Sequence, residues 1–176
     1  TSLTAIFNEP PSADSEQVYA RVRDRYASLG LTLLPRLGFN NTFAILVRGE
    51  DAKRLGLKTI SDLSQTLRPT TSAKASTFAT ATADRSAVKK PDSTWRAGFG
   101  YEFLERPDGF KGLSAAYGLA LAAAPRVMDL NLIYRAVAAG EIDVTAGDAT
   151  SGLIGALGLA VLDDDRRYFP VYDAAP

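Results

Sequence analysis

The stretch RVMDLNLIYRAVAAGEIDVTA, residues 126–146, holds the pattern that decides the fold. Two short apolar runs, residues 126–130 and 142–146, flank a segment with helical spacing at residues 132–139. A strand, a helix and a second strand in this order form a βαβ unit, because parallel strands need a crossover that a helix usually supplies. The stretch therefore predicts parallel strands covered by a helix.

The same alternation continues on both sides of this stretch. We predict strands at residues 96–101 and 159–162, and helices at residues 109–123 and 151–158. Strands alternating with helices argue for an α/β fold with a mainly parallel sheet and helices on its faces. Sheets of this kind bind ligands beyond the carboxyl ends of their strands, so site residues are expected there.

The N-terminal part of the chain is less regular. One helix is expected near Asp14 or Ser15, either of which can cap it, and a second at residues 59–67 with Thr59 or Ser61 as its cap. Short apolar runs predict three strands, at residues 4–7, 31–34 and 42–47. Residues 68–94 are mostly Ser, Thr and Ala, which predicts a low-complexity loop without a core of its own.

Composition excludes several kinds of chemistry. The 176 residues carry 20 basic and 20 acidic side chains, so no net field draws the chain to nucleic acid or an anionic membrane. There is no cysteine or histidine, which removes thiolate metal sites, cysteine nucleophiles and the usual general base. No phosphate-loop or Gly-x-Ser-x-Gly motif is present. We therefore predict no enzyme activity, no metal and no cofactor.

Arg106 lies in the segment GYEFLERPDGFKGL, residues 100–113, before a predicted helix that begins near Asp108. The unpaired N–H groups and positive dipole end of a helix, together with a guanidinium fork, suit a carboxylate or a phosphate. A surface ion pair between Arg106 and Glu102 or Glu105 explains the same residues. Composition leaves both interpretations open.

Two more segments contain candidate site residues. YFPVY, residues 168–172, is a stiff aromatic segment that suits either binding of a quaternary ammonium group or core packing. The three aspartates before it, residues 163–165, fit a solvated turn better than a calcium loop. DATSG, residues 148–152, reads as a strand end that becomes a helix start. There Asp148 would point into a cleft, while Thr150 or Ser151 would cap the helix.

Four segments share their order and spacing with one protein family. They are GFNNTF (38–43), KTISDL (58–63), GYEFLERPDGFKGL with the downstream YRAVAAGEIDV (134–144), and LDDDRRYFPVYDAAP (162–176). Together they resemble the substrate-binding proteins of osmoprotectant ABC importers, which carry glycine betaine, choline, carnitine and related compounds. The resemblance runs through nearly the whole chain apart from the low-complexity loop.

The resemblance implies a type II periplasmic-binding-protein-like fold, in which two lobes close on a ligand about a hinge. On this basis residues 1–44 are a fragment of lobe one with the first crossover, residues 45–168 are a complete lobe two, and residues 169–176 are the second crossover. The chain resembles only the middle of such a protein. We therefore expect uncovered apolar surface, which dimerisation or strand exchange could bury.

The resemblance also implies roles for single residues. Arg106 matches the arginine that holds the ligand carboxylate, which favours the anion site over the surface ion pair. Tyr172 matches one tyrosine of an aromatic box for the cationic head, Phe43 stands at a box position that is commonly aromatic, and Thr1 matches a threonine lining the site from lobe one.

The chain departs from the family at one motif. Where the family commonly reads Tyr-x-Thr-Asp-Gly, Asp148 replaces the box tyrosine, Thr150 keeps the threonine and Ser151 replaces the aspartate. A carboxylate favours a cation that donates hydrogen bonds, whereas a tyrosine box needs none. We therefore expect a zwitterion related to a betaine or an amino acid, with choline and glycine betaine still possible.

The resemblance implies further partners and a location. An ABC permease is the expected protein partner, the expected location is extracytoplasmic, and no nucleic acid is expected. A non-transporting sensor or scaffold of the same fold is the alternative, and a small-molecule enzyme is the weaker one, because one fold hosts many functions.

Overall fold

The computed structural model describes residues 6–9, 14–68 and 95–176. Thr1 and the predicted loop from residue 69 to residue 94 lie outside the described residues. Of the strand predicted at residues 4–7, only Ile6 and Phe7 are described, and they lie in a turn instead.

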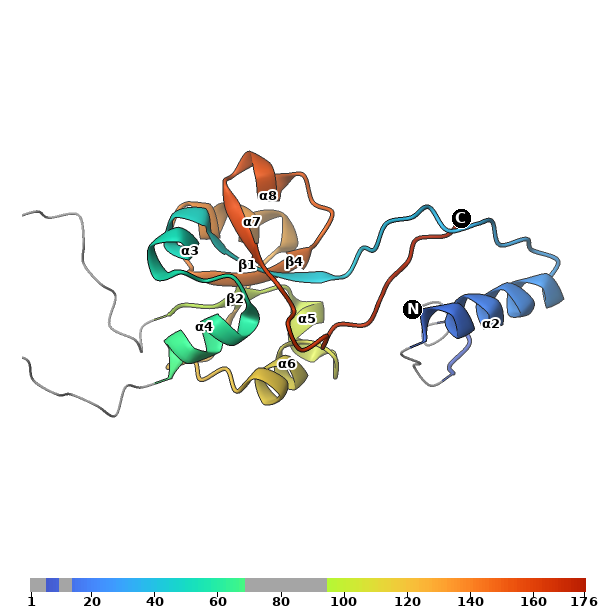
Figure 1. Cartoon of the computed structure of the whole chain (residues 1–176), viewed down its shortest axis with the longest axis horizontal. Helices are drawn as coiled ribbons and strands as arrows, with labels where there is room; N and C mark the ends of the chain where they lie inside the picture. Colours follow the sequence, from blue (N-terminus) through green and yellow to red (C-terminus); the bar gives the residue numbers. More distant parts are fainter. Residues whose placement is uncertain (1–5, 10–13, 69–94) are drawn as a thin grey trace, which may run out of the picture.

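Figure 1 shows a packed body from which an arm extends. The body comprises residues 43–68 and 95–169. The arm comprises residues 14–42, which contain the helix α2 (Ser15–Ser28), and residues 170–176. These two arm segments leave the same side of the body and run beside each other (Figure 1).

A three-stranded sheet in the order β4-β1-β5 lies at the centre of the body. The strands are β1 (Phe43–Arg48), β4 (Val144–Asp148) and β5 (Leu159–Leu162), and both pairs are antiparallel. The strands β2 (Gly98–Phe99) and β3 (Arg126–Val127) pair in parallel, and a parallel bridge from Ala97 to Val144 connects them to β4.

The prediction of a mainly parallel sheet was wrong about the pairing. β2, β3, β4 and β5 run in one direction, as the βαβ pattern requires, but β1 lies between β4 and β5 and runs the opposite way. Leu46 and Val47 of β1 are fully buried, which explains the central position of β1, because a strand that is apolar on both faces is most stable between two neighbours. The fold is mixed α/β.

The side chains of β1 alternate between two cores. Ile45 and Val47 pack into one cluster, and Ala44 and Leu46 pack into the other, because successive strand residues point to opposite faces. In Figure 1 the helices α4, α5 and α6 lie on one side of the sheet and α7 and α8 on the other. The helices of the body are α3 (Gly49–Leu55), α4 (Ile60–Leu67), α5 (Tyr101–Glu105), α6 (Phe110–Tyr117), α7 (Leu130–Ala138) and α8 (Leu153–Ala156).

Local capping residues set several helix ends. Asp14 caps α2 through its side chain, and Thr59 caps α4 in a capping box with Asp62, so Ser15 and Ser61 are not the caps. The helix predicted at residues 109–123 ends at Tyr117, because Gly118 adopts a left-handed conformation with φ of 67°. α5 was not predicted, since five residues are too few to show a helical period.

The strand predicted at residues 31–34 is absent. Leu31 and Leu34 are 56% and 51% exposed, and no strand of either sheet includes them. This part of the arm instead runs antiparallel to the C-terminal segment. Hydrogen bonds join Leu34 N–H to the carbonyl of Pro176 (2.8 Å) and Asn41 N–H to the carbonyl of Tyr172 (3.0 Å).

Candidate functional site

Four of the predicted site residues line one cavity of about 100 Å³: Phe43, Arg106, Asp148 and Tyr172, together with Asn41. Phe43 begins β1 and is paired in register with Asp148 at the end of β4. Arg106 follows the end of α5, and Tyr172 comes from the arm. The cavity thus lies at the carboxyl end of β4, as expected, and at the junction of body and arm.

The guanidinium of Arg106 is already strongly engaged. Its Nε and Nη2 donate to the two carboxylate oxygens of Asp108 at 2.8 and 2.7 Å, and its Nη1 donates to Glu102 at 3.0 Å. A second bond from Nη2 reaches the hydroxyl of Tyr172 at 2.9 Å. The ion pair with Glu102 is therefore present and Glu105 is not the partner, whereas anion binding by Arg106, which also lines the cavity, stays a prediction.

Electrostatics fix the protonation states of this group. Hydrogen bonding to Asp108 raises the pKa of Arg106, and the same bond, which outweighs burial, lowers the pKa of Asp108. Burial and the charge of Asp108 raise the pKa of Tyr172, whose hydroxyl donates to Asp108 at 3.1 Å. At neutral pH the site therefore holds a charged guanidinium, a charged carboxylate and a neutral phenol.

Asp148 is held by its backbone and not through its carboxylate. Its N–H donates to the hydroxyl of Tyr134 at 2.9 Å, and Tyr134 is buried on α7. Gly147 makes room for this contact, because a Cβ at that position would meet Cζ of Tyr134 at 2.7 Å. The carboxylate itself is exposed and forms no ion pair with any side chain in the described part of the chain.

Asn41 is a cavity residue that the sequence analysis missed, although it lies in the quoted segment GFNNTF. Its amide oxygen accepts a hydrogen bond from the hydroxyl of Thr150 at 2.6 Å, which leaves the NH₂ end of the amide as a donor. Thr150 does not line the cavity itself and acts on it through Asn41. The amide oxygen of the adjacent Asn40 accepts the backbone N–H of Tyr172 at 2.7 Å.

The aromatic segment YFPVY divides between two roles. Phe169 is buried and packs against Phe43 and Phe103, with ring centroids 6.0 and 6.3 Å apart, so core packing explains it. Tyr172 is the residue of this segment that lines the cavity. There the guanidinium carbon of Arg106 lies 5.7 Å from the ring centroid of Phe43.

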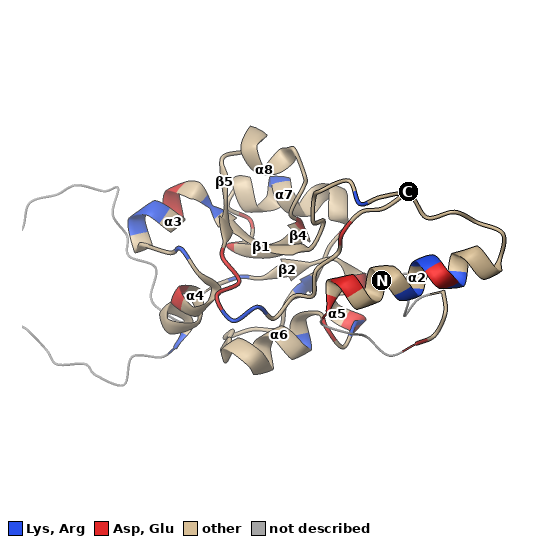
Figure 2. Cartoon of the chain, turned by 45° about the vertical axis from the view of Figure 1, so that its right-hand side comes forward, with Lys and Arg blue, Asp and Glu red and all other residues tan. Residues whose placement is uncertain are grey.

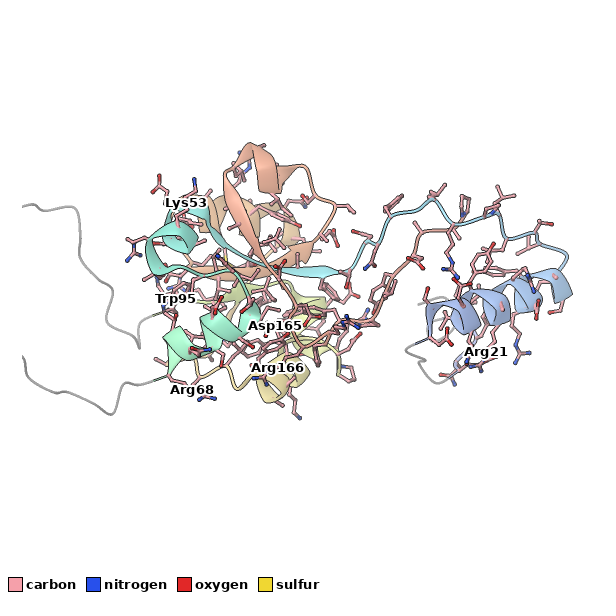
Figure 3. The ribbon with its side chains drawn as sticks, in the orientation of Figure 1. Arg21, Lys53, Arg68, Trp95, Asp165 and Arg166 are labelled. Carbon is pink, nitrogen blue, oxygen red and sulfur yellow. The ribbon has the colours of Figure 1, made fainter. Side chains whose placement is uncertain are left out.

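The three aspartates after β5 anchor the chain that leads to the arm. Asp164 accepts the N–H groups of Tyr168 and Phe169 at 2.9 and 2.8 Å, and Asp165 accepts the N–H of Ser61 at 3.2 Å. Figure 3 labels Asp165 and Arg166 in this turn. Over the described residues, no group of acidic side chains is arranged to hold a metal ion. The turn is structural and fixes the direction in which the arm leaves.

Two larger cavities lie elsewhere. One of about 220 Å³ lies between α2 and the C-terminal arm segment, where Arg36 stacks on Tyr19 at 4.8 Å and pairs with Asp173 at 3.2 Å. The other, of about 510 Å³, is lined mainly by glycines, small apolar residues and the lysines Lys53 and Lys58. We favour the smaller cavity, because among these three cavities of the described residues it alone adds a side-chain amide to opposite charges and aromatic rings, and it lies at the carboxyl end of β4.

Comparison with known proteins identifies the family. The family model described as the substrate binding domain of the ABC-type glycine betaine transport system matches residues 7–176. The chain belongs to this family. A glycine-betaine-binding protein of Pseudomonas aeruginosa is 33% identical over 177 residues, covering 100% of the chain and 52% of that protein. The carnitine transport binding protein OpuCC of Listeria monocytogenes is 29% identical over 179 residues, covering 99% of the chain and 49% of that protein.

Other relatives extend the comparison. The ergothioneine transport permease and binding protein EgtU of Helicobacter pylori is 30% identical over 157 residues, covering 89% of the chain and 24% of that protein. The crystal structure of a glycine betaine/carnitine/choline ABC transporter superposes with a TM-score of 0.74 at 28% identity, covering 99% of the chain and 55% of its own. Apo YehZ from Escherichia coli, at a TM-score of 0.67 and 23% identity, shares the fold.

The chain spans about half the length of the first two relatives. The relatives are named as transport or binding proteins and not as enzymes. Among the helices that the structure describes, none has the length and apolar character needed to cross a membrane.

Proposed function

We propose that the chain is the solute-binding part of an ABC importer and that it holds a small zwitterionic or quaternary-ammonium solute between two lobes. The observation that carries this proposal is the convergence of Arg106, Asp148, Phe43 and Tyr172 on one cavity. A cation and an anion at one site complement the two ends of a betaine-like or amino-acid-like molecule.

In this proposal each side chain has a defined role. Asp148 receives the cationic part of the solute, because its carboxylate faces the cavity without an ion-pair partner in the described part of the chain. The rings of Phe43 and Tyr172 flank that part. Arg106 takes the solute carboxylate, and Asn41, held by Thr150, donates a hydrogen bond to it. Thr1 would approach from lobe one.

The carboxylate of Asp148 narrows the class of solute. A free carboxylate gains most from an N–H donor such as an ammonium, a guanidinium or an imidazole-type ring, whereas a trimethylammonium group donates no conventional hydrogen bond. Glycine betaine, carnitine and ergothioneine, named for the relatives, are betaines, and ergothioneine also carries ring N–H groups. We therefore propose a donor-bearing zwitterion ahead of choline.

The arm would provide the connection between lobes. Its two segments run antiparallel, with Asn41 bonded to Tyr172 and Leu37 bonded to Ala174 at 2.9 Å. We propose that these segments are the two crossovers of a hinge, with the body as lobe two. The permease would be the protein partner and the location extracytoplasmic.

A thermal-shift panel tests the function. It compares choline, glycine betaine, carnitine, proline, basic amino acids and imidazole-containing betaines on residues 1–176 and on a protein with both lobes. Binding to the native state raises the melting temperature by mass action. A response of the two-lobed protein alone supports a solute held between lobes, and no response from either protein to any compound contradicts the proposal and favours a sensor or scaffold.

Substitutions then test the individual roles. Arg106→Ala should weaken a carboxylate-bearing solute about tenfold or more and choline much less, because truncating one partner of a charge pair leaves the other unpaired. Asp148→Asn should weaken donor-bearing cations most. Equal losses for choline and for the carboxylate solute in Arg106→Ala would contradict the carboxylate assignment.

A further inference from the structure

Arg106 and Asp108 form a pair that the local sequence encodes. Arg106, Pro107, Asp108 and Gly109 make a tight turn, in which Gly109 N–H donates to the carbonyl of Arg106 at 3.0 Å. Pro at the second position and Gly at the fourth are typical of such turns. A Cβ at Gly109 would lie 2.9 Å from the carbonyl carbon of Phe103, so only glycine fits. The turn folds Asp108 back onto the guanidinium two residues before it.

This pairing fills one of the two edges through which arginine binds carboxylates. The Nε and Nη2 edge carries both oxygens of Asp108 at 2.8 and 2.7 Å, in the fork geometry that a ligand carboxylate would otherwise use. The remaining edge, between Nη1 and Nη2, meets the hydroxyl of Tyr172. Within the described structure, four of the five N–H groups of Arg106 have partners, so a ligand carboxylate finds few free donors.

The charges around the cavity also disfavour a ligand that carries only a carboxylate. Arg106 contributes one positive charge, whereas Glu102, Asp108 and Asp148 contribute three negative charges, which leaves these four side chains at −2. Glu102 is 67% exposed in its side chain and Asp108 is 36% exposed, so solvent screens Glu102 more. Asp108 therefore offsets the charge of Arg106 most effectively.

We propose that Asp108 is a specificity-determining residue of the site: by occupying the Nε and Nη2 edge of Arg106 it selects solutes that carry a cationic group and rejects those that carry only a carboxylate. This inference rests on the proposed function. It assigns selectivity to a side chain that binds Arg106 and that does not itself line the cavity.

The experiment measures dissociation constants by calorimetry for choline and glycine betaine in the two-lobed protein. Asp108→Asn should strengthen glycine betaine and weaken choline, so that the ratio of their dissociation constants shifts about tenfold toward the carboxylate ligand. Glu102→Gln should shift it about twofold, because that group is more exposed. Glu105→Gln is the control and should leave this ratio of dissociation constants unchanged. It is the same kind of change next to Arg106, on an exposed side chain that does not touch the guanidinium.

A ratio that stays constant in Asp108→Asn, or moves toward choline, overturns the role of Asp108 while leaving the proposed function intact. If the unaltered two-lobed protein binds neither choline nor glycine betaine, the proposed function itself is refuted. If Asp108→Asn does not fold, a second measurement on the unaltered protein tests the inference, with a ligand that carries only a carboxylate. The tert-butylacetate anion, in which carbon replaces the nitrogen of glycine betaine, should bind at least a hundredfold more weakly than glycine betaine. Binding within threefold would overturn the inference.

Discussion

The helices α2 and α7 show how differently the arm and the body use similar local signals. Both are capped by an aspartate, Asp14 in α2 and Asp129 in α7. The nine residues of α7 include four that are buried, whereas α2 buries only Val22 among fourteen. Charged residues are spread along α2, as Figure 2 shows. Local sequence can thus start and end a helix, but burial requires a partner surface.

The same difference extends to the apolar residues around these helices. In the body Leu46, Leu113 and Ile133 are completely buried, whereas in the arm Leu29 and Leu37 are 64% and 59% exposed. Leucine is as apolar in one region as in the other. The candidate site lies where the two regions meet, since Asn41 and Tyr172 come from the arm and the other cavity residues from the body.

The largest expected effect is in the core of the body. Leu113→Ala removes a completely buried side chain and leaves a cavity, so the free energy of unfolding should fall by about 3 kcal/mol. Urea denaturation followed by circular dichroism measures this loss. A loss below about 1 kcal/mol would show that the body is not a close-packed unit and would remove the contrast with the arm.

A smaller effect is expected where the body positions Asp148. Gly147→Ala forces a methyl group against Tyr134, so the free energy of unfolding should fall by about 1–3 kcal/mol, with weaker solute binding. Gly152→Ala is the matched control, because nothing lies within 4 Å of its Cβ and its φ is −61°. Equal stability of the two variants would argue against the Tyr134 contact.

A pH effect of intermediate size tests a local signal inside the body. Hydrogen bonds from the backbone N–H groups of Lys58 and Thr59 lower the pKa of Asp62 in the folded chain. The ionised carboxylate therefore contributes its full stabilisation above the unfolded pKa of about 3.9, and this stabilisation is lost as the pH falls through the lower folded pKa. Asp62→Asn should cost about 0.5 kcal/mol near pH 6, and the difference should close between about pH 4 and pH 2.

Thermal denaturation across this range measures the difference. Gln65→Ala, on an exposed and non-titrating side chain of the same helix, is the control, and its difference from the unaltered chain should not change with pH. A gap for Asp62→Asn that persists at pH 2 would mean that the side chain acts by packing and not by charge.

The smallest effect is expected in the arm. Leu34→Ala should change the free energy of unfolding of residues 1–176 by less than about 0.5 kcal/mol, because the side chain is half exposed. In a protein with both lobes the same substitution should cost about 2 kcal/mol if a neighbouring lobe covers it. A cost above 1.5 kcal/mol in this chain would indicate that a second copy already buries the arm, which sedimentation would detect as a dimer.

Prediction from the sequence succeeded where signals are local. The strand at residues 159–162 was placed at its observed bounds, and α4 ends at its predicted residue. Resemblance to a family also selected four side chains that line one cavity. Prediction missed Asn41 in the cavity lining, because the hydrogen bond that orients its amide comes from Thr150, 109 positions away in the sequence.

The sequence by itself determined features that arise within a few residues, such as the aspartate and threonine caps. The left-handed turn at Gly118 and the Arg106–Gly109 turn are equally local, although we had predicted that the helix continues past Gly118 and had not predicted the pair of Arg106 with Asp108. Only the tertiary structure decided that β1 separates β4 from β5, that Tyr172 reaches Arg106 from 66 positions away, and that the leucines of the arm stay exposed. The physical reason is range, because caps and turns are set by neighbouring backbone groups, whereas burial and pairing depend on which distant surface is available.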